Sequence, residues 1–245
     1  MKNSYRVIIL VSRLSLKNLS LLGSSTNVFA QRVIEPELLD YAEPRIARKN
    51  LAELVRINRL FGGHSVIRKL LAASAGRQEA FTVLDIGAAS GDTARVIRHT
   101  YPRATVTSLD YREVNIEAAP YPKLIADAFY LPFRPNSFDF VMSSLFLHHF
   151  TDKQVMALLH SFHAIARRGV LMADLERHFA PYFFLKLTKP LFGWDWLTVH
   201  DGLASVRAAF RSSELAALAR RAGLGTAEIR TNRPAFRLTL KASKI

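Results

Sequence analysis

A glycine turn joins a short apolar run to a predicted helix start and carries acidic side chains on both sides. The stretch reads Val83-Leu-Asp85-Ile-Gly87-Ala-Ala89-Ser-Gly91-Asp92. Glycine allows a ligand to approach the backbone closely, which is typical of a cofactor-binding turn. A dinucleotide-binding turn would have glycine at positions 89 and 92, and an aspartate at the helix start would repel a pyrophosphate. The turn therefore favours a cofactor that brings cationic groups to Asp85 and Asp92.

Two further acids follow at the ends of the next two predicted strands. Asp110, in Leu109-Asp-Tyr111, is placed to accept both hydroxyls of an adenosine ribose. Asp127, in Ile125-Ala-Asp-Ala-Phe129, is a short acid for an adenine amino group, with apolar neighbours that would sandwich the ring. A fourth segment, residues 138–150, is a predicted strand followed by a loop. Ligands of open α/β sheets bind at such carboxyl ends, so we expect these segments to form one site.

In this order and spacing the four segments resemble the class I S-adenosylmethionine (SAM) dependent methyltransferases, in particular the branch of the ubiquinone and menaquinone enzymes. The resemblance covers residues 81–174. It implies SAM as cofactor and a site formed by Asp85, Gly87, Gly91, Asp110 and Asp127, to which we add their neighbours Ala89, Tyr111 and Ala128, and Ser143 at the fourth segment. Ala89 departs from the family, which often has glycine there, and could cramp the methionine moiety.

The flanking segments 39–45, 50–63 and 200–207 resemble small-molecule methyltransferases encoded beside type III polyketide synthases. This resemblance implies a small-molecule acceptor and a role in secondary metabolism. We expect an aromatic or lipophilic acceptor, methylated on oxygen rather than on carbon.

His148 and His149, in the loop after the fourth segment, are the candidate catalytic residues. A neutral imidazole is the natural proton acceptor near pH 7, so either could deprotonate a phenol or another hydroxyl. The alternative is that one of them points into the sheet or caps the next helix. Transfer from a sulfonium depends mainly on alignment of the nucleophile, so proximity without a base is a second alternative.

Four more side chains are candidates for the substrate pocket, although such residues are often only structural: Tyr41, Arg45, His64 and His200. Asp174, Glu176 and His178 follow a predicted strand, but alternate residues of an extended chain point in different directions. We therefore predict no metal site.

Composition excludes several classes of protein. The chain has no cysteine, and hence no disulfide, no thiolate metal site and no cysteine nucleophile of the kind that attacks a pyrimidine ring. No apolar run approaches the roughly 20 residues of a membrane span. We expect a cytoplasmic protein, with contact to a membrane surface as a further interpretation. The oligomeric state is not predicted.

The net charge of +14 is concentrated in the flanks. Residues 1–80 contain 13 Lys and Arg against 6 Asp and Glu, and residues 175–245 contain 12 against 5. Residues 81–174 are neutral, with 9 of each sign. Basic flanks suit an RNA methyltransferase. However, the loop after Met142 reads Ser-Ser-Leu-Phe rather than the Asn/Asp-Pro-Pro-aromatic sequence of amino-adenine enzymes, so we do not expect a nucleic-acid partner. A non-catalytic SAM-fold binding protein is the other alternative.

The elements that position these residues alternate between strand and helix, which predicts a Rossmann-like α/β fold. We expect a seven-stranded, mostly parallel sheet with an antiparallel C-terminal hairpin and an N-terminal helical cap. Predicted strands cover 81–86, 104–109, 123–126, 138–143, 169–173, 226–230 and 235–240. Predicted helices cover 35–61, 66–73, 91–100, 112–118, a segment capped by Thr151 and Gln154, and one from Ser212 to Gly223.

These elements suggest three regions. Residues 1–34 are an N-terminal extension, interpreted as a flexible tail rather than a signal peptide, and 35–80 are the cap. Residues 81–245 form the SAM-binding methyltransferase domain. An aromatic-rich insertion at 177–200 could be a lid over a greasy pocket, a helix at a lipid surface, or ordinary core.

Overall fold

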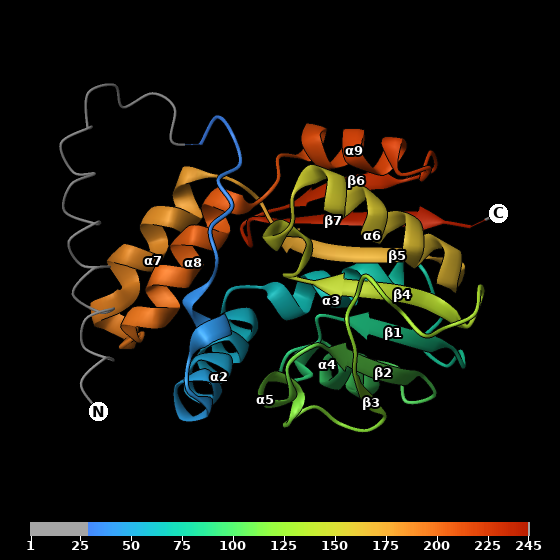
Figure 1. Cartoon of the computed structure of the whole chain (residues 1–245), viewed down its shortest axis with the longest axis horizontal. Coiled ribbons are helices and arrows are strands. Elements are labelled where there is room, and N and C mark those ends of the chain that lie inside the picture. Colours follow the sequence, from blue (N-terminus) through green and yellow to red (C-terminus); the bar gives the residue numbers. More distant parts are fainter. Residues whose placement is uncertain (1–28, 245) are drawn as a thin grey trace. The chain divides into compact units, whose positions relative to one another are not determined.

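The computed structural model describes residues 29–244, so most of the predicted extension over 1–34 lies outside the described residues. Contacts divide the chain into a unit of residues 1–31 and a unit of residues 32–245. The second unit contains a seven-stranded sheet with helices on both of its faces (Figure 1).

The sheet has the strand order β3-β2-β1-β4-β5-β7-β6. All its strand pairs are parallel except those of β7, which runs antiparallel to both β5 and β6. This confirms the predicted fold class. The strands are β1 (Thr82–Ile86), β2 (Thr105–Asp110), β3 (Lys123–Ile125), β4 (Phe138–Ser144), β5 (Ala166–Leu175), β6 (Glu228–Asn232) and β7 (Arg237–Ser243).

The chain builds outward from β1 in both directions, through β2 and β3 on one side and β4 and β5 on the other. The strand order therefore reverses between β1 and β4. In open α/β sheets the crevice outside the carboxyl ends of the strands at such a reversal is where ligands bind. The topology thus predicts the site between the loops that follow β1 and β4.

Helices cover the two faces of the sheet with separate apolar clusters. On one face α6 (Asp152–Ile165) and α9 (Ser212–Arg221) bury side chains such as Leu158, Phe162 and Leu215. The start of α6 has the predicted capping box between Thr151 and Gln154. The other face is covered by α3 (Gly63–Ala72) and α4 (Asp92–Thr100), and α5 (Glu113–Ile116) packs beside β2.

The helix predicted over 35–61 is shorter in the structure. A 3-10 helix, η2 (Leu38–Tyr41), comes first, and α2 (Pro44–Leu60) starts only after an extended Glu43. The residue before a proline is disfavoured in helical conformation, so Pro44 sets the start of α2. Gly62, with φ of 86°, separates α2 from α3, which begins at Gly63 rather than at the predicted Val66.

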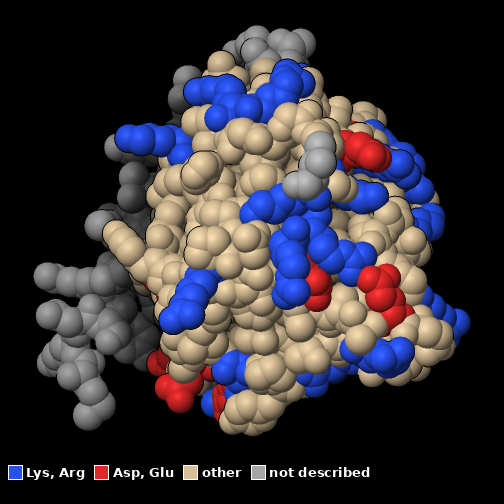
Figure 2. Space-filling view, turned by 90° about the vertical axis from the view of Figure 1, so that its right-hand side faces the viewer, with Lys and Arg blue, Asp and Glu red and all other residues tan. Residues whose placement is uncertain are grey.

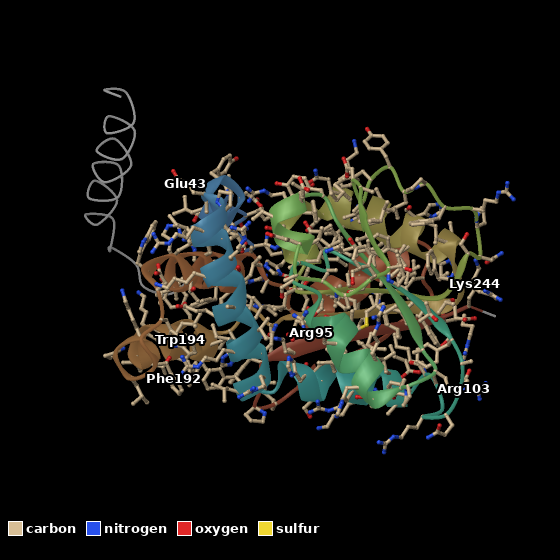
Figure 3. The ribbon with its side chains drawn as sticks, turned by 90° about the horizontal axis from the view of Figure 1, so that it is seen from below. Glu43, Arg95, Arg103, Phe192, Trp194 and Lys244 are labelled. Carbon is tan, nitrogen blue, oxygen red and sulfur yellow. The ribbon has the colours of Figure 1, made fainter. Side chains whose placement is uncertain are left out.

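Two segments far apart in the sequence form the cap. The predicted insertion folds into α7 (Phe179–Phe192) and the start of α8 (Trp196–Ala208). These helices lie beside η2 and α2 at the carboxyl end of the parallel strands (Figure 1). Aromatic contacts join them, because Phe61 meets the rings of Phe184, Phe192 and Trp194 at centroid distances of 4.8, 5.6 and 6.4 Å. Phe192 and Trp194 lie beside the end of α2 farthest from Glu43 (Figure 3).

Within residues 29–244, none of the helices has the length and apolar character required to cross a membrane. The terminal hairpin turns at 233–236, slightly later than predicted, because β6 extends to Asn232.

Candidate cofactor and acceptor site

A cavity of about 1060 Å³ lies at the carboxyl ends of β1 to β4. Ligand pockets usually measure roughly 300–1,000 Å³, so this one has room for more than one ligand. Its cofactor-side wall is made by the loops that follow the strands, and its other wall by α2, α7, α8 and the β6–β7 turn. Of the predicted cofactor and catalytic residues, those that line it are Gly87, Ala89, Asp110, Tyr111, Asp127, Ala128, His148 and His149.

Asp110 is held firmly at the end of β2. Oδ2 accepts a hydrogen bond from the Ala89 N–H at 2.9 Å, and Oδ1 accepts from the Arg112 N–H at 3.2 Å. Burial raises the pKa of this carboxyl, although these hydrogen bonds oppose the rise. A carboxylate has about four acceptor positions, so capacity remains for a ribose hydroxyl.

Asn115, which the sequence analysis missed, completes this part of the wall. Its Nδ2 lies 3.4 Å from Oδ1 of Asp110, and its own Oδ1 is buried without a hydrogen-bond partner. Asn115 also lines the cavity. An unpaired buried acceptor beside Asp110 suits the second hydroxyl of a ribose.

Asp127 presents one carboxylate oxygen for a ligand. Its Oδ1 accepts a hydrogen bond from the Phe129 N–H at 2.9 Å, closing a local turn. Phe129 lines the cavity and packs edge-on against Phe150, with ring centroids 5.4 Å apart. A carboxylate with an aromatic ring beside it fits an adenine amino group and the adenine face, so the predicted role of Asp127 stays a prediction that this geometry allows.

Three predicted cofactor residues do not line the cavity. Gly91 turns the chain into α4 with φ of 74°, and a Cβ there would lie 2.7 Å from Ala119 and Pro120. Ser143 is buried in β4 between neighbouring strands. These two residues therefore shape the turn and the sheet rather than the cavity surface.

Asp85, the third, is buried beneath the turn, and neither carboxylate oxygen has a hydrogen-bond partner in the part of the chain that the structure describes. Burial, with smaller contributions from the charges of Asp110 and Asp92, raises its pKa to about 8. A buried carboxylate without a partner is costly, and a cationic group nearby would relieve that cost. The polar groups at the cavity, with Asp85 buried beneath its turn, therefore fit a ligand with a ribose, an adenine and a cationic amino-acid end, as SAM has.

The turn itself is packed tightly. The Phe146 ring lies against Gly87, where an added Cβ would be 2.2 Å from the ring. Ala89 has φ of 45°, a left-handed conformation that favours glycine. Its methyl group contacts the cluster that includes Leu39 and Leu51 of the cap, so the alanine ties the cofactor turn to the cap.

Ala89→Gly is expected to stabilise the fold slightly. The left-handed conformation costs alanine roughly 1–2 kcal/mol, and the lost methyl contact offsets about 0.8 kcal/mol of that gain. We therefore expect the free energy of unfolding, measured by urea denaturation, to rise by about 0.5 kcal/mol. Ala88→Gly, at the buried neighbour without positive φ, is the control and should lose stability. A loss for Ala89→Gly equal to that of the control would show that the methyl contact outweighs the strain.

The predicted catalytic pair lies in η3 (Leu147–His149), after β4. His148 is buried, and its Nδ1 lies 2.6 Å from Oδ1 of Asp174 at the end of β5. Asp174 also accepts from the His148 backbone N–H at 3.3 Å and from the Leu175 N–H at 2.7 Å. The Nε2 atom of His148 is buried without a partner. Asp174 is thus a site residue whose role the sequence did not reveal.

His149 is less constrained. Its Nδ1 lies 3.7 Å from Oε1 of Glu37, a residue that also lines the cavity and accepts a hydrogen bond from the Ser205 hydroxyl. One side-chain nitrogen or oxygen atom from each of Glu37, His148 and His149 lies within 4.8 Å of the other two. The two imidazole rings are tilted, with centroids 4.1 Å apart. Burial, followed by the neighbouring His148, lowers the pKa of His149.

The four side chains predicted for the substrate pocket do not line this cavity. Tyr41 and Arg45 are exposed on η2 and at the start of α2. His64 instead pairs with Asp92, at 2.9 Å between Nε2 and Oδ2, and His200 is half-exposed beside Asp201. Tyr41, Arg45 and His200 are exposed to solvent, whereas His64 is largely buried against Asp92 of α4.

Apolar residues form the wall opposite the cofactor loops. Leu54 and Ile57 of α2, Phe61 directly after it, and Phe184 and Leu185 of α7 all line the cavity. The turn of the terminal hairpin adds Ala235 and Phe236. This wall suits an apolar molecule.

Comparisons with known proteins agree with this geometry. Residues 84–173 match a methyltransferase domain family. The ubiquinone/menaquinone biosynthesis C-methyltransferase UbiE of Desulfotalea psychrophila is 33% identical over 92 residues, which are 35% of this chain and only 37% of that protein's length.

Solved structures share the fold over most of the chain. A SAM-dependent methyltransferase from Aquifex aeolicus has a TM-score of 0.56 at 15% identity, covering 83% of this chain and 100% of its own. The plantazolicin methyltransferase BpumL with S-adenosylhomocysteine has a TM-score of 0.61 at 13% identity, with 82% and 90% covered. Magnesium protoporphyrin IX methyltransferase of Synechocystis PCC 6803 has a TM-score of 0.52 at 16% identity, and the match covers 81% of this chain and 87% of that one. Residues 84–173 are therefore similar to a methyltransferase domain, and the chain has the Rossmann-like fold of SAM-dependent methyltransferases.

Proposed function

We propose that this chain transfers the methyl group of SAM to a small, lipophilic and aromatic acceptor, leaving S-adenosylhomocysteine. Oxygen is the favoured acceptor atom and carbon the next. One observation carries the proposal: a single cavity joins the loops with Asp110 and Asp127 to the apolar wall of the cap. A methyl donor on one side and an apolar acceptor on the other would meet near η3.

The assignment of chain groups to the cofactor follows from the polar atoms that the cavity leaves available. Asp110 and Asn115 would hold the ribose, Asp127 the adenine amino group, and Asp85 would balance the positive charge of the amino-acid end. SAM supplies an electrophilic methyl group on a sulfonium. The role of the cap is to align the acceptor and to exclude water, because alignment is the larger part of such a transfer.

Titration calorimetry of the purified full chain with SAM and S-adenosylhomocysteine tests the cofactor. We expect dissociation constants on the order of micromolar, as is common for enzyme ligands. An acceptor screen with alkyl phenols would follow, read by mass spectrometry of the methylated products. No binding of either nucleoside by the folded chain would contradict the proposal, and tight SAM binding without turnover on any acceptor would favour a non-catalytic binding protein.

RNA methylation is the competing function that the net charge suggests. Several basic residues lie at the opposite end of the sheet from the cavity: Arg103 precedes β2, Arg167 and Arg168 begin β5, and Lys244 follows β7. Lys and Arg are spread over that face of the molecule (Figure 2), and Arg103 and Lys244 are far from the cap (Figure 3). A basic surface away from the cavity does not bring a base to the methyl group. RNA binding that weakens steeply with salt, together with RNA methylation, would reverse this conclusion.

Membrane contact and the source of the acceptor are also part of the proposal. Phe183, Leu187 and Leu191 form an exposed apolar row on α7, with Lys186 and Lys189 at its side. Such a row suits the surface of an anionic membrane, from which a lipophilic acceptor could enter the cavity. The resemblance to small-molecule methyltransferases encoded beside type III polyketide synthases supports a role in secondary metabolism, which we place in the cytoplasm.

A further inference from the structure

Asp174 orients His148, a residue that lines the cavity, so that its other ring nitrogen is buried without a hydrogen-bond partner among the described residues. An ionised carboxylate can only accept hydrogen bonds, so Nδ1 of His148 must carry a hydrogen in its 2.6 Å contact with Asp174. In the neutral ring Nε2 then holds the lone pair. Within residues 29–244 Nε2 has no hydrogen-bond partner, and His148 lines the cavity.

The charges around the ring favour its protonated form. Burial opposes that form, but the charge and hydrogen bond of Asp174 outweigh it, so the pKa of His148 lies above its usual value. Asp174 itself has a lowered pKa despite its burial, because His148 stabilises its ionised form. The other titratable or charged groups that act on the two histidines are Glu37 and Asp40 near η2, Arg32 before them, and Arg237 of β7, which acts on Asp174.

We infer that His148, oriented by Asp174, accepts the proton of an ionisable hydroxyl, so that the acceptor is a lipophilic phenol or enol methylated on oxygen. This inference rests on the proposed function. The hydroxyl proton moves to Nε2 of His148, the oxygen forms the bond to the methyl carbon of SAM, and the electrons of the broken carbon–sulfur bond stay on sulfur. The products are the methyl ether, S-adenosylhomocysteine and an imidazolium that later releases its proton to solvent.

The class of acceptor follows from the match between base and wall. A phenol has a pKa of about 10, so it is neutral and a poor nucleophile in an apolar pocket until its proton leaves. An imidazole whose protonated form is stabilised by a buried carboxylate can take that proton as the new bond forms. His149 lacks such support, because its closest carboxylate oxygen, in Glu37, is 3.7 Å away.

The test compares two acceptors in the full chain. One is 4-pentylphenol, and the other is its 2-nitro derivative, which is more acidic and needs less help from a base. We expect His148→Gln and Asp174→Asn to lower kcat on 4-pentylphenol by about 10²- to 10⁴-fold and to have much smaller effects on the nitro compound. His149→Gln is the matched variant, and the ratio of its kcat values on the two acceptors should equal the ratio for the parent. The kcat of the parent should rise with pH through the raised pKa of His148.

A second readout needs no acceptor. Nitrogen NMR of the imidazole rings should show the Nδ1–H tautomer for His148 and a pKa above the usual value of about 6.5, and Asp174→Asn should lower that pKa. Calorimetry should show unchanged SAM affinity in all three variants.

Several outcomes would overturn the inference while leaving methyl transfer intact. They are equal losses on both phenols, a loss caused by His149→Gln alone, inactivation by a metal chelator, or turnover only of acceptors without a hydroxyl. Failure of the parent to bind SAM would instead remove the proposed function itself.

Discussion

Replacing Asp110 by alanine is expected to weaken SAM binding about 100-fold, which corresponds to roughly 2.7 kcal/mol. The substitution removes the charged acceptor for a ribose hydroxyl and leaves the Ala89 N–H without its 2.9 Å partner. Hydrogen bonds to charged groups contribute about 1.5–3 kcal/mol each, so the loss is large although the rest of the cavity remains. Calorimetry with SAM and S-adenosylhomocysteine measures it.

Two companion variants separate binding from folding. Asp110→Asn keeps one acceptor oxygen and should lose only part of the affinity. Glu117→Gln changes an exposed partner of Arg48 on the same side of the sheet and should leave SAM binding unchanged. Thermal unfolding must show that the variants are folded at the assay temperature. Affinity within about threefold of the parent for a folded Asp110→Ala chain would mean that the ribose binds elsewhere.

Asp85→Asn is expected to flatten the pH dependence of stability in the chain without SAM. The pKa of Asp85 is about 8 in the fold against an ordinary 3.8. Between these values the folded chain holds a proton that the unfolded chain has released, so the free energy of unfolding falls as pH rises from about 4 to 8. Over this window the loss is roughly 5–6 kcal/mol. Asparagine does not titrate, so the variant lacks this pH-dependent contribution to the free energy of unfolding.

Urea denaturation at pH 5 and pH 8 measures the difference. At pH 8 we expect the variant to be about 2 kcal/mol more stable than the parent, since the buried amide still costs about 1–3 kcal/mol. At pH 5 the parent should be at least as stable as the variant, because its carboxyl is protonated there. Parallel pH curves for the two chains would show that Asp85 is ionised in the fold. Added SAM should raise the free energy of unfolding of the parent more than that of the variant, because only the parent has a carboxylate to balance the charge of SAM.

The cofactor half of the site was largely predictable because its residues follow consecutive strands. Gly87 directly follows β1, Asp110 is the last residue of β2, and Asp127 is the second residue after β3. Parallel strands bring their carboxyl ends to one edge of the sheet. Local patterns thus contained both the fold and most of this wall. Asn115 was missed because an asparagine in a short helix has no distinctive spacing.

The acceptor half was not predictable in the same way. Asp174 lies 26 positions after His148 in the sequence, and Glu37, the partner of His149, comes from the segment before the first helix of the cap. Such pairs depend on the packing of β4, β5 and the cap, which no local pattern specifies. Tyr41 and His200 were chosen for their chemistry alone, and the helix faces that carry them point away from the cavity. The apolar character of the insertion was visible, but its place against α2 was not.

The construction of the cap has a consequence for how this protein can diversify. The strands and the loops that face the cofactor are continuous with the buried sheet, whereas α2 and α7 reach the cavity from two peripheral segments. Substitutions at Leu54, Ile57, Phe184 or Leu185 would reshape the acceptor wall without disturbing the sheet or the cofactor loops. Evolution can therefore change the acceptor through a few side chains on two helices, while the strand ends that serve the methyl donor stay the same.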